Sequence, residues 1–248
     1  MKDILTYHSW DERKVNEINT KLHDSMDVLN WTFKEYGDEV VYACSFGAEG
    51  MVMLDLIYRV KRDAKVRFLD TELHFSETYR LIERAKKKYP EMDIECIKPS
   101  LSLQVQEEIY GERLWERSPD KCCHLRKVVP LAEQLEGRAA WISGLRTGQS
   151  PERDKLQFIN KDEKFQSIKI CPLIHWSWED IWSYIKLHQL PYNELHDKNY
   201  PSIGCKVCTL PASNPEDLRS GRWANTNKKE CGLHKVFSDA EKGGVTID

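Results

Sequence analysis

The sequence predicts an α/β fold in which a mostly parallel, doubly wound sheet carries helices on both faces. Short apolar segments alternate along the chain with amphipathic segments of about 10–15 residues that have helical spacing. This alternation is typical of crossover units, which build parallel sheets. No internal repeat or low-complexity segment interrupts it, and 248 residues are enough to bury a sizeable core.

Five segments are expected to form strands. Each is a short apolar run bounded by polar or turn-forming residues. The expected strands cover residues 39–44, 65–69, 93–97, 139–143 and 165–173.

Helices are expected between these strands, and two of them begin at capping signals. Ser76 can cap a helix that ends near Tyr89 and Pro90. Ser177 and Asp180 resemble a capping box at the start of another helix. The expected helices lie before residue 40, at residues 51–62, 76–89 and 122–135, and from residue 178 onward.

The chain becomes rich in Gly and Pro after about residue 200 and is expected to be mostly loop there. A long segment of this kind on a compact domain is usually functional or disordered. We therefore divide the chain into an α/β domain at residues 1–215 and a flexible C-terminal segment at residues 216–248.

The composition excludes several classes of protein. With 37 basic and 40 acidic side chains the formal charge is −3, so the chain has no overall attraction for nucleic acid or an anionic membrane. No apolar run approaches the roughly 18 residues of a membrane span. The N-terminal sequence MKDILTYHSWDERK lacks an apolar signal segment. We expect a cytoplasmic protein without a nucleic-acid or membrane partner.

The cysteine pattern favours metal binding over a disulfide framework. Cys122 and Cys123 are adjacent, so their Cα atoms lie about 3.8 Å apart, closer than in a usual bridge. Together with Cys205 and Cys208 of a CxxC pair, they supply four thiols suited to one metal centre. A redox-active CxxC pair and inert thiols remain alternatives.

Polar segments follow three of the expected strands, at the edge where ligands bind in a doubly wound sheet. Residues 45–50 contain a hydroxyl and two glycines before an expected helix, so backbone N–H groups there can hold an anion. Asp70 and Thr71 follow the second strand, and residues 144–153 bring two arginines to the same edge. By themselves, these segments also fit an ordinary strand–helix turn and a solvated loop.

A cluster of basic residues precedes a single cysteine near the C-terminus. Four cations between residues 219 and 229 lie before Cys231, and His234 lies three residues beyond it. Cationic neighbours stabilise a thiolate, which is the nucleophile of cysteine chemistry. The pattern indicates a reactive thiol, with an incidental surface thiol as the alternative.

In this order, the segments closely resemble the assimilatory sulfonucleotide reductases, a branch of the adenine-nucleotide α-hydrolase (PP-loop) proteins. The joint occurrence of the CC pair, the CxxC pair and ECGLH is the most specific part of the resemblance, which spans residues 40–234. The matching segments are SFGAEG at 45–50, LDT at 69–71, CCHLRKVVPL at 122–131, GLRTGQSPER at 144–153, CPLIHWSWEDIWSYI at 171–185, LPYNELHDKNYPSIGCKVCT at 190–209, RSGRW at 219–223 and ECGLH at 230–234.

The resemblance implies an activity, a cofactor and partners. Family members with both cysteine pairs hold a 4Fe–4S cluster and reduce adenosine 5′-phosphosulfate to sulfite and AMP in sulfate assimilation. Thioredoxin or glutaredoxin supplies the electrons, and the members are commonly homo-oligomers. Residues 1–215 would then bind the nucleotide and carry the cluster.

The resemblance also assigns roles to individual residues. Cys231 matches the catalytic nucleophile. The cluster ligands correspond to Cys122, Cys123, Cys205 and Cys208. The substrate-binding positions correspond to Ser45, Phe46, Gly47, Ala48, Glu49, Leu69, Asp70, Thr71, Lys127, Gly144, Arg146, Arg153, Arg219, Arg222 and His234.

This chemistry requires positive charge at the site. The Cys231 thiolate would attack the sulfate sulfur, AMP would leave, and an S-sulfocysteine would remain on the enzyme. Because both reactants are anionic, fixed cations have to neutralise the sulfate oxygens, and each charge-assisted hydrogen bond contributes about 1.5–3 kcal/mol. We expect Arg219, Arg222 and Lys127 to do this.

Lys127 has a second expected role. It follows Cys123 by four residues and would lie on the same face of a helix. An Fe₄S₄ core of charge 2+ held by four thiolates carries a net charge of about −2, which Lys127 would couple to the sulfate group. The cluster would then act electrostatically and structurally, without passing electrons. The C-terminal segment would close over the substrate and open to present the S-sulfocysteine to thioredoxin.

Three other interpretations stay open at this point. The same chemistry can use the 3′-phosphorylated donor, or both donors. A PP-loop enzyme that adenylates its substrate, such as a tRNA-modifying sulfur-transfer enzyme, would consume ATP. A zinc-binding module without enzymatic activity would use the four cysteines structurally.

Overall fold

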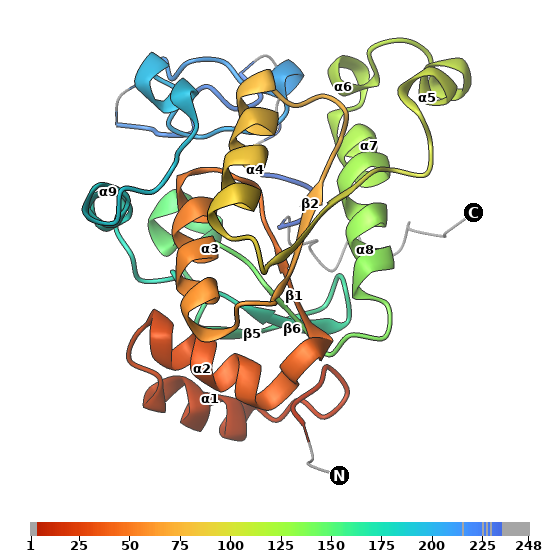
Figure 1. Cartoon of the computed structure of the whole chain (residues 1–248). Coiled ribbons are helices and arrows are strands. Elements are labelled where there is room, and N and C mark those ends of the chain that lie inside the picture. Colours follow the sequence, from red (N-terminus) through yellow and green to blue (C-terminus); the bar gives the residue numbers. More distant parts are fainter. Residues whose placement is uncertain (1–3, 215, 225, 227, 229, 235–248) are drawn as a thin grey trace.

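A six-stranded sheet lies at the centre of the computed structural model, which describes residues 4–214, 216–224, 226, 228 and 230–234 (Figure 1). The strands are β1 (Val40–Ala43), β2 (Lys65–Leu69), β3 (Asp93–Ile97), β4 (Ala140–Ile142), β5 (Ile159–Asp162) and β6 (Ser167–Ile170). They lie in the order β3-β2-β1-β4-β6-β5, and every neighbouring pair is parallel except β5 with β6. The expected mostly parallel sheet is confirmed.

The sequence located five of these strands and missed β5. β5 has the sequence INKD, in which only Ile159 and Asp162 are buried, so it carries little apolar signal. The turn after β5 includes Phe165 and Gln166, and Gln166 has a φ of 47°. The strand expected at 165–173 therefore begins two residues later, at Ser167.

Helices surround the sheet, and several differ from the expected ranges. The α-helices are α1 (Glu12–Lys21), α2 (Ser25–Tyr36), α3 (Ala48–Val60), α4 (Ser76–Lys88), α5 (Leu103–Tyr110), α6 (Leu114–Arg117), α7 (Pro119–Cys123), α8 (Val129–Leu135) and α9 (Trp178–Leu187). Short 3₁₀ turns cover Gly37–Glu39, Thr147–Gln149, Pro151–Arg153, Glu194–Lys198 and Lys206–Cys208. No described helix is both long and apolar enough to span a membrane.

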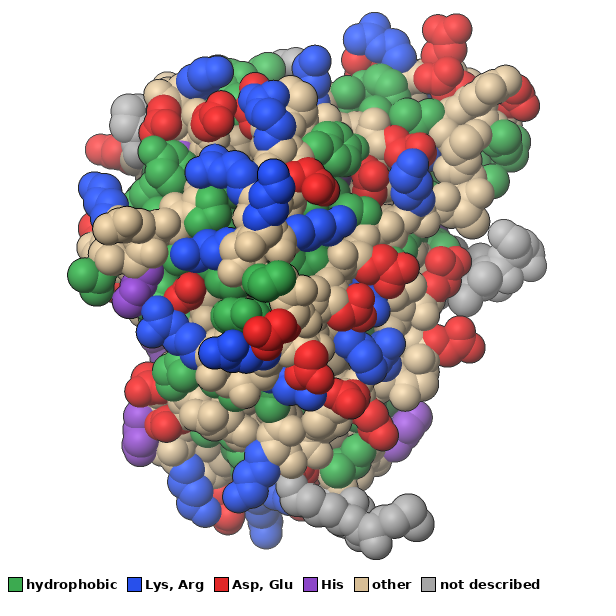
Figure 2. Space-filling view, in the orientation of Figure 1, with side chains coloured by type: hydrophobic (Ala, Val, Ile, Leu, Met, Phe, Trp, Pro, Cys, Tyr) green, Lys and Arg blue, Asp and Glu red, His purple; other side chains and the backbone are tan. Residues whose placement is uncertain are grey.

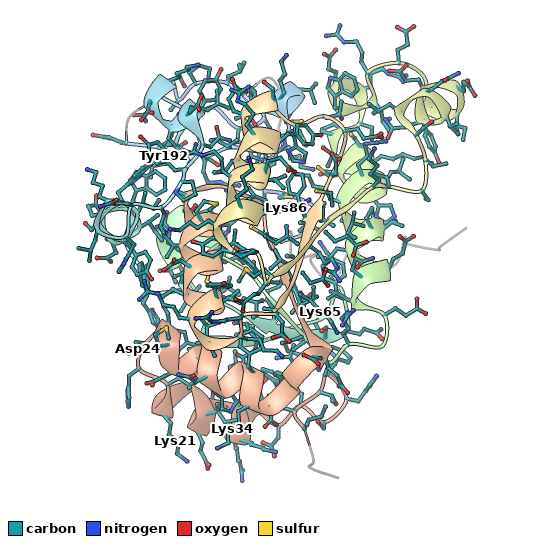
Figure 3. The ribbon with its side chains drawn as sticks, in the orientation of Figure 1. Lys21, Asp24, Lys34, Lys65, Lys86 and Tyr192 are labelled. Carbon is teal, nitrogen blue, oxygen red and sulfur yellow. The ribbon has the colours of Figure 1, made fainter. Side chains whose placement is uncertain are left out.

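Capping explains where two of these helices begin. Asp24 accepts hydrogen bonds from the N–H groups of Met26 and Asp27, so a second helix starts there and the N-terminal helical region is divided into two. Asp24 lies on the left side of the lower half of the molecule in Figure 3. The predicted capping box of Ser177 and Asp180 is confirmed. The predicted cap at Ser76 is wrong, because Phe75 occupies that position and Ser76 is the first helical residue.

Side chains alternate between the two faces of the sheet. Tyr42 and Ile142 pack into the larger core, which includes most of α3. Val41 and Trp141, which alternate with them, pack on the opposite face against Leu131 of α8. Both faces are thus covered by helices, as a doubly wound sheet requires.

The segment expected as one helix at 122–135 consists of α7, the π-helical turn His124–Val128, and α8. Arg126 in this turn is buried and donates to the carbonyl oxygen of Thr71 at 2.7 Å and to Glu72 Oε2 at 2.6 Å. These bonds fix the two cysteines of α7 beside the end of β2, at the edge where a ligand is expected.

The C-terminal loops return to the same edge of the sheet. Lys206 donates its N–H to the carbonyl of Leu73, and Cys205 forms an isolated bridge with His74. The part of the expected flexible segment beyond His234 lies outside the described residues. On the face seen in Figure 2, basic and acidic side chains are interspersed.

Candidate active site

A cavity of ≈ 180 Å³ lies beyond the carboxyl ends of β1, β2 and β4. The residues that line it come from the loops after these strands, from α3, from the π-helical turn and from the C-terminal loops. The expected site residues found in its lining are Ser45, Gly47, Ala48, Glu49, Leu69, Lys127, Gly144, Arg146, Arg153, Arg219, Arg222, Cys231 and His234.

Three expected substrate-binding residues do not line this cavity. Phe46 is fully buried and packs edge-on against Phe68, with a ring-centroid separation of 5.5 Å. The Asp70 carboxylate accepts a hydrogen bond from the Tyr79 hydroxyl at 2.6 Å. Thr71 Oγ1 lies 3.2 Å from Cys205 Sγ. Their side chains shape the surrounding loops.

The start of α3 presents backbone N–H groups at the cavity. Gly47 occupies the N-cap position and has no side chain to cap the helix, which leaves these donors available to an anion. Glu49 Oε1 accepts hydrogen bonds from Arg146 Nε and Nη2 at 3.0 and 2.8 Å, and from Gln149 Nε2 at 2.9 Å. The charge of Arg146 is therefore balanced within the protein, and the loop after β4 is tied to α3.

A second carboxylate, Glu230, holds two more of the expected cationic residues. Its oxygens accept hydrogen bonds from Arg153 Nε and Nη2 at 3.0 and 2.9 Å, and from Arg219 Nη2 at 3.0 Å. Burial alone would raise the pKa of Glu230, but the two guanidinium groups bring it below its usual value. Glu230 is thus a carboxylate at neutral pH. Its sequence pattern predicted no role for this residue, although Glu230 lies beside Cys231 in the ECGLH segment.

Two cations in the cavity have no such partner. Among the described residues, the cavity cations that form ion pairs with carboxylates are Arg146, Arg153 and Arg219. Within that part of the chain, no carboxylate pairs with Arg222 or Lys127. Arg222 Nη1 donates to Ser202 Oγ at 3.1 Å, and its guanidinium lies over the Trp223 ring. These two residues hold positive charge that an anionic ligand can use.

Lys127 is surrounded by thiols. Burial alone would lower its pKa, but the nearby sulfur atoms of Cys205, Cys231 and Cys123 raise it above the ordinary lysine value. The side chain is therefore protonated at neutral pH. Cys123 is one of the thiols that act on Lys127, although a π-helical turn, in place of the expected α-helix, separates the two residues.

Cys231 lies half-buried within this group. A hydrogen bond from the Cys123 thiol lowers the pKa of Cys231 well below the ordinary value; burial opposes this effect, and the charge of Lys127 adds to it. The neighbouring His234 stacks on Trp141 with an interplanar angle of 5°. Burial and the nearby Arg153 hold the pKa of His234 well below its usual value, so its imidazole is neutral.

The two cysteine pairs are brought to the same region from different parts of the chain. Burial raises the pKa of Cys122 to about 11, with a further contribution from Cys205 and Cys208. No three His, Cys, Asp or Glu side chains among the described residues are arranged to hold a single metal ion. One zinc ion would require all its thiolates at about 2.3 Å from one centre. Four thiols are the donor set that iron–sulfur clusters use, and a Cys₄ zinc site uses the same set.

The RSGRW segment is anchored on the CxxC loop through Gly221. Leu210 donates its N–H to the carbonyl of Gly221 at 2.8 Å, and Trp223 donates to the carbonyl of Cys208 at 3.0 Å. A Cβ atom at Gly221 would overlap the carbonyl oxygen of Leu210. The contact leaves no room for a side chain, so glycine is required where the two segments cross.

We predict that Gly221→Ala lowers the free energy of unfolding by about 1–3 kcal/mol, the usual cost of overpacking a close contact. Urea denaturation under reducing conditions measures this change. Gly148→Ala is the matched control, because a Cβ atom there would meet nothing closer than Arg146 Nη1 at 3.9 Å. Equal stability of the two variants would contradict the close contact between Gly221 and the carbonyl oxygen of Leu210.

The comparisons with known proteins agree with the resemblance seen in the sequence. Residues 39–211 match the model of the phosphoadenosine phosphosulfate reductase domain family. An adenosine 5′-phosphosulfate reductase of Halalkalibacterium halodurans is 60% identical over 223 residues, which cover 89% of this chain and 96% of the relative. Adenosine 5′-phosphosulfate reductase 2 of Bacillus subtilis is 54% identical over 235 residues, covering 95% of this chain and all of the relative.

Solved structures agree with the fold. The phosphoadenylyl-sulfate reductase of Candida auris, in a phosphate complex, aligns with a TM-score of 0.70 at 30% identity and covers 82% of this chain and 98% of that one. The FMN adenylyltransferase of Candida glabrata has a TM-score of 0.56 at 18% identity, covering 79% of this chain and 65% of that one, and shows the fold alone. Since the family match covers most of the sequence and near relatives align along their full length, the chain belongs to the phosphoadenosine phosphosulfate reductase domain family.

Proposed function

We propose that this protein reduces adenosine 5′-phosphosulfate to sulfite and AMP in sulfate assimilation, through an S-sulfocysteine on Cys231. The relatives that align along nearly their full length are named as reductases of this substrate. The observation that carries the proposal is the position of Cys231, which lines the cavity together with Lys127 and Arg222, two cations whose charges favour its ionised form. An ionised thiol at this edge of the sheet is suited to attack an electrophile held there.

The first step transfers a sulfonate group. The Cys231 thiolate attacks the sulfate sulfur, a sulfur–sulfur bond forms, and the sulfur–oxygen bond to the phosphate breaks so that AMP leaves with the electron pair. A thiolate of thioredoxin or glutaredoxin then attacks Cys231 Sγ and releases sulfite. The second thiol of the same carrier resolves the mixed disulfide, which returns Cys231 as a thiolate and leaves the carrier oxidised.

The cations of the cavity divide into two groups in this mechanism. Arg222 and Lys127 have no carboxylate partner among the described residues, and we assign them to the sulfate oxygens. Arg146, Arg153 and Arg219 are engaged by carboxylates and order the surrounding loops, so Arg219, which was expected at the sulfate, is assigned to this second group. Each charge-assisted hydrogen bond to the sulfate contributes about 1.5–3 kcal/mol and reduces the repulsion between two anions.

We further propose that Cys122, Cys123, Cys205 and Cys208 hold a 4Fe–4S cluster. Such a group, when bound, supplies negative charge beside Lys127 and a rigid link between α7 and the CxxC loop. Lys127 interacts with Cys123 and Cys205 and lies in the cavity, so its charge couples this region to the sulfate position. We also propose a cytoplasmic homo-oligomer without a nucleic-acid or membrane partner.

A second candidate substrate is the 3′-phosphorylated donor, because the family model and the Candida auris structure are named for it. The rates of sulfite release from the two purified donors separate these activities. Consumption of ATP would instead favour a sulfur-transfer enzyme. Under each of these alternatives, Cys231 remains a thiol of the cavity lining that acts on the charge of Lys127.

We predict that Cys231→Ser abolishes covalent labelling by radiolabelled adenosine 5′-phosphosulfate under anaerobic conditions without reductant. The serine hydroxyl is not ionised at neutral pH and is a far weaker nucleophile. Wild type and the matched control Cys96→Ser should both carry label, since Cys96 lies in β3 outside the cavity lining. Label on Cys231→Ser would refute the assignment of the nucleophile.

We predict that anaerobically purified protein contains about four irons and as many acid-labile sulfides per chain, because four thiols are available to one cluster. Cys205→Ala should lose most of this iron, while Cys96→Ala should retain it. Metal analysis and the visible absorption of the cluster measure both. Zinc in place of iron, or full iron content in Cys205→Ala, would contradict the cluster and favour a structural zinc site.

A further inference from the structure

Glu230 is placed where it can control the position of the proposed nucleophile. Its side chain is 7% exposed and its two oxygens accept hydrogen bonds from Arg153 and Arg219. Ser150 Oγ also donates to Glu230 Oε2, at 3.4 Å. The backbone N–H of Cys231 donates to Glu230 Oε1 at 2.7 Å. The carboxylate thus joins the main chain at Cys231 to a guanidinium of the α/β domain.

The other contacts that hold residues 230–234 and the neighbouring Lys228 are not ion pairs between two buried charges. Lys164 donates to the carbonyl of Gly232, and Leu233 packs against the apolar cluster that contains Trp141. His234 stacks on Trp141. Lys228 forms an ion pair with Asp120, whose side chain is largely exposed. Among these contacts only the pair of Glu230 with Arg153 joins two nearly inaccessible opposite charges.

Removing one partner of a buried ion pair is costly, because the other charge is left without compensation. When Glu230 is bound to Arg153, Cys231 is held next to Lys127 and Cys123. When Glu230 moves away, Arg153 loses its carboxylate partner. The contact therefore favours one position of the thiol. In the proposed mechanism this position suits attack on the nucleotide, whereas reduction by a carrier protein needs the half-buried thiol to become accessible.

We propose that Glu230 is a positioning residue. Its contacts with Arg153 and Arg219, which we call the clasp, hold the Cys231 segment (residues 230–234) in place for sulfur transfer and release it for reduction. This inference rests on the proposed function, since it assigns the two half-reactions to the seated and released positions of Cys231. It predicts opposite effects of one substitution on the two half-reactions. A residue that only supported the fold would impair both.

The test compares wild type with Glu230→Gln, which keeps the size of the side chain and removes its charge. Anaerobic single-turnover labelling by adenosine 5′-phosphosulfate should be slower by about tenfold or more, the factor expected for a charge-assisted contact. Release of sulfite from preformed S-sulfoenzyme by thioredoxin should be as fast as in wild type or faster. Glu230→Asp, which retains the charge, should restore part of the labelling rate.

Alkylation of Cys231 in the nucleotide-free protein gives an independent measurement. At about pH 9, where even an ordinary thiol is mostly ionised, the rate reports access more than ionisation. Iodoacetamide followed by mass spectrometry should modify Cys231 of Glu230→Gln about tenfold faster than in wild type, given the same loss of a charge-assisted contact. Glu133→Gln, an exposed position on α8, is the control and should match wild type in every assay.

The outcomes separate the clasp from the proposed function. Absence of label on wild type, or label on Cys231→Ser, would overturn the proposed function, while the alkylation result would still decide whether Glu230 holds the segment. Wild-type labelling and alkylation rates in Glu230→Gln would overturn the clasp alone. Equal slowing of labelling and of sulfite release, with unchanged alkylation, would also overturn it and assign Glu230 a structural role.

Discussion

Repulsion between like charges is the constraint on which this site depends. In the proposed reaction, a thiolate has to approach an anionic sulfate group in a region that already contains four other thiols. The structure meets this by bringing cations from several elements to one cavity and balancing only some of them. Glu49 binds Arg146, and Glu230 binds Arg153 and Arg219. Arg222 and Lys127 carry no such partner among the described residues, so their charge acts on Cys231 and, in the proposed reaction, on the sulfate group.

The fold places these charges by attaching distant segments to the carboxyl edge of the sheet. Arg126 ties the π-helical turn to the end of β2, which sets the position of both Lys127 and the adjacent cysteines. The CxxC loop is attached to the same strand end through His74 and Cys205. Gly221 then joins the loop that carries Arg219 and Arg222 to the CxxC loop. The proposed cofactor site and the proposed anion site are therefore parts of one connected structure.

The local signals in the sequence predicted much of this fold. The ranges of β2 and β3 agree with the structure because each is a run of strand-forming residues between clear turns. β5 could not be found in this way. Its sequence INKD has no run of apolar residues, and its place in the sheet is set by its antiparallel pairing with β6. The motifs located most of the cavity lining, but not the role of Glu230. Its partner Arg153 lies 77 residues away, and a single sequence contains no signal for such an ion pair.

We propose that Lys127 and Arg222 supply the charge for attack by Cys231. This role is tested most directly by the single-turnover rate of S-sulfonation at saturating adenosine 5′-phosphosulfate in Lys127→Gln and Arg222→Gln, with iron content measured alongside. The account predicts a loss of about tenfold or more in each variant. Lys86→Gln, which removes a partly exposed cation of α4, should leave the rate unchanged. Wild-type rates in both cavity variants, with the cluster intact, would contradict the account.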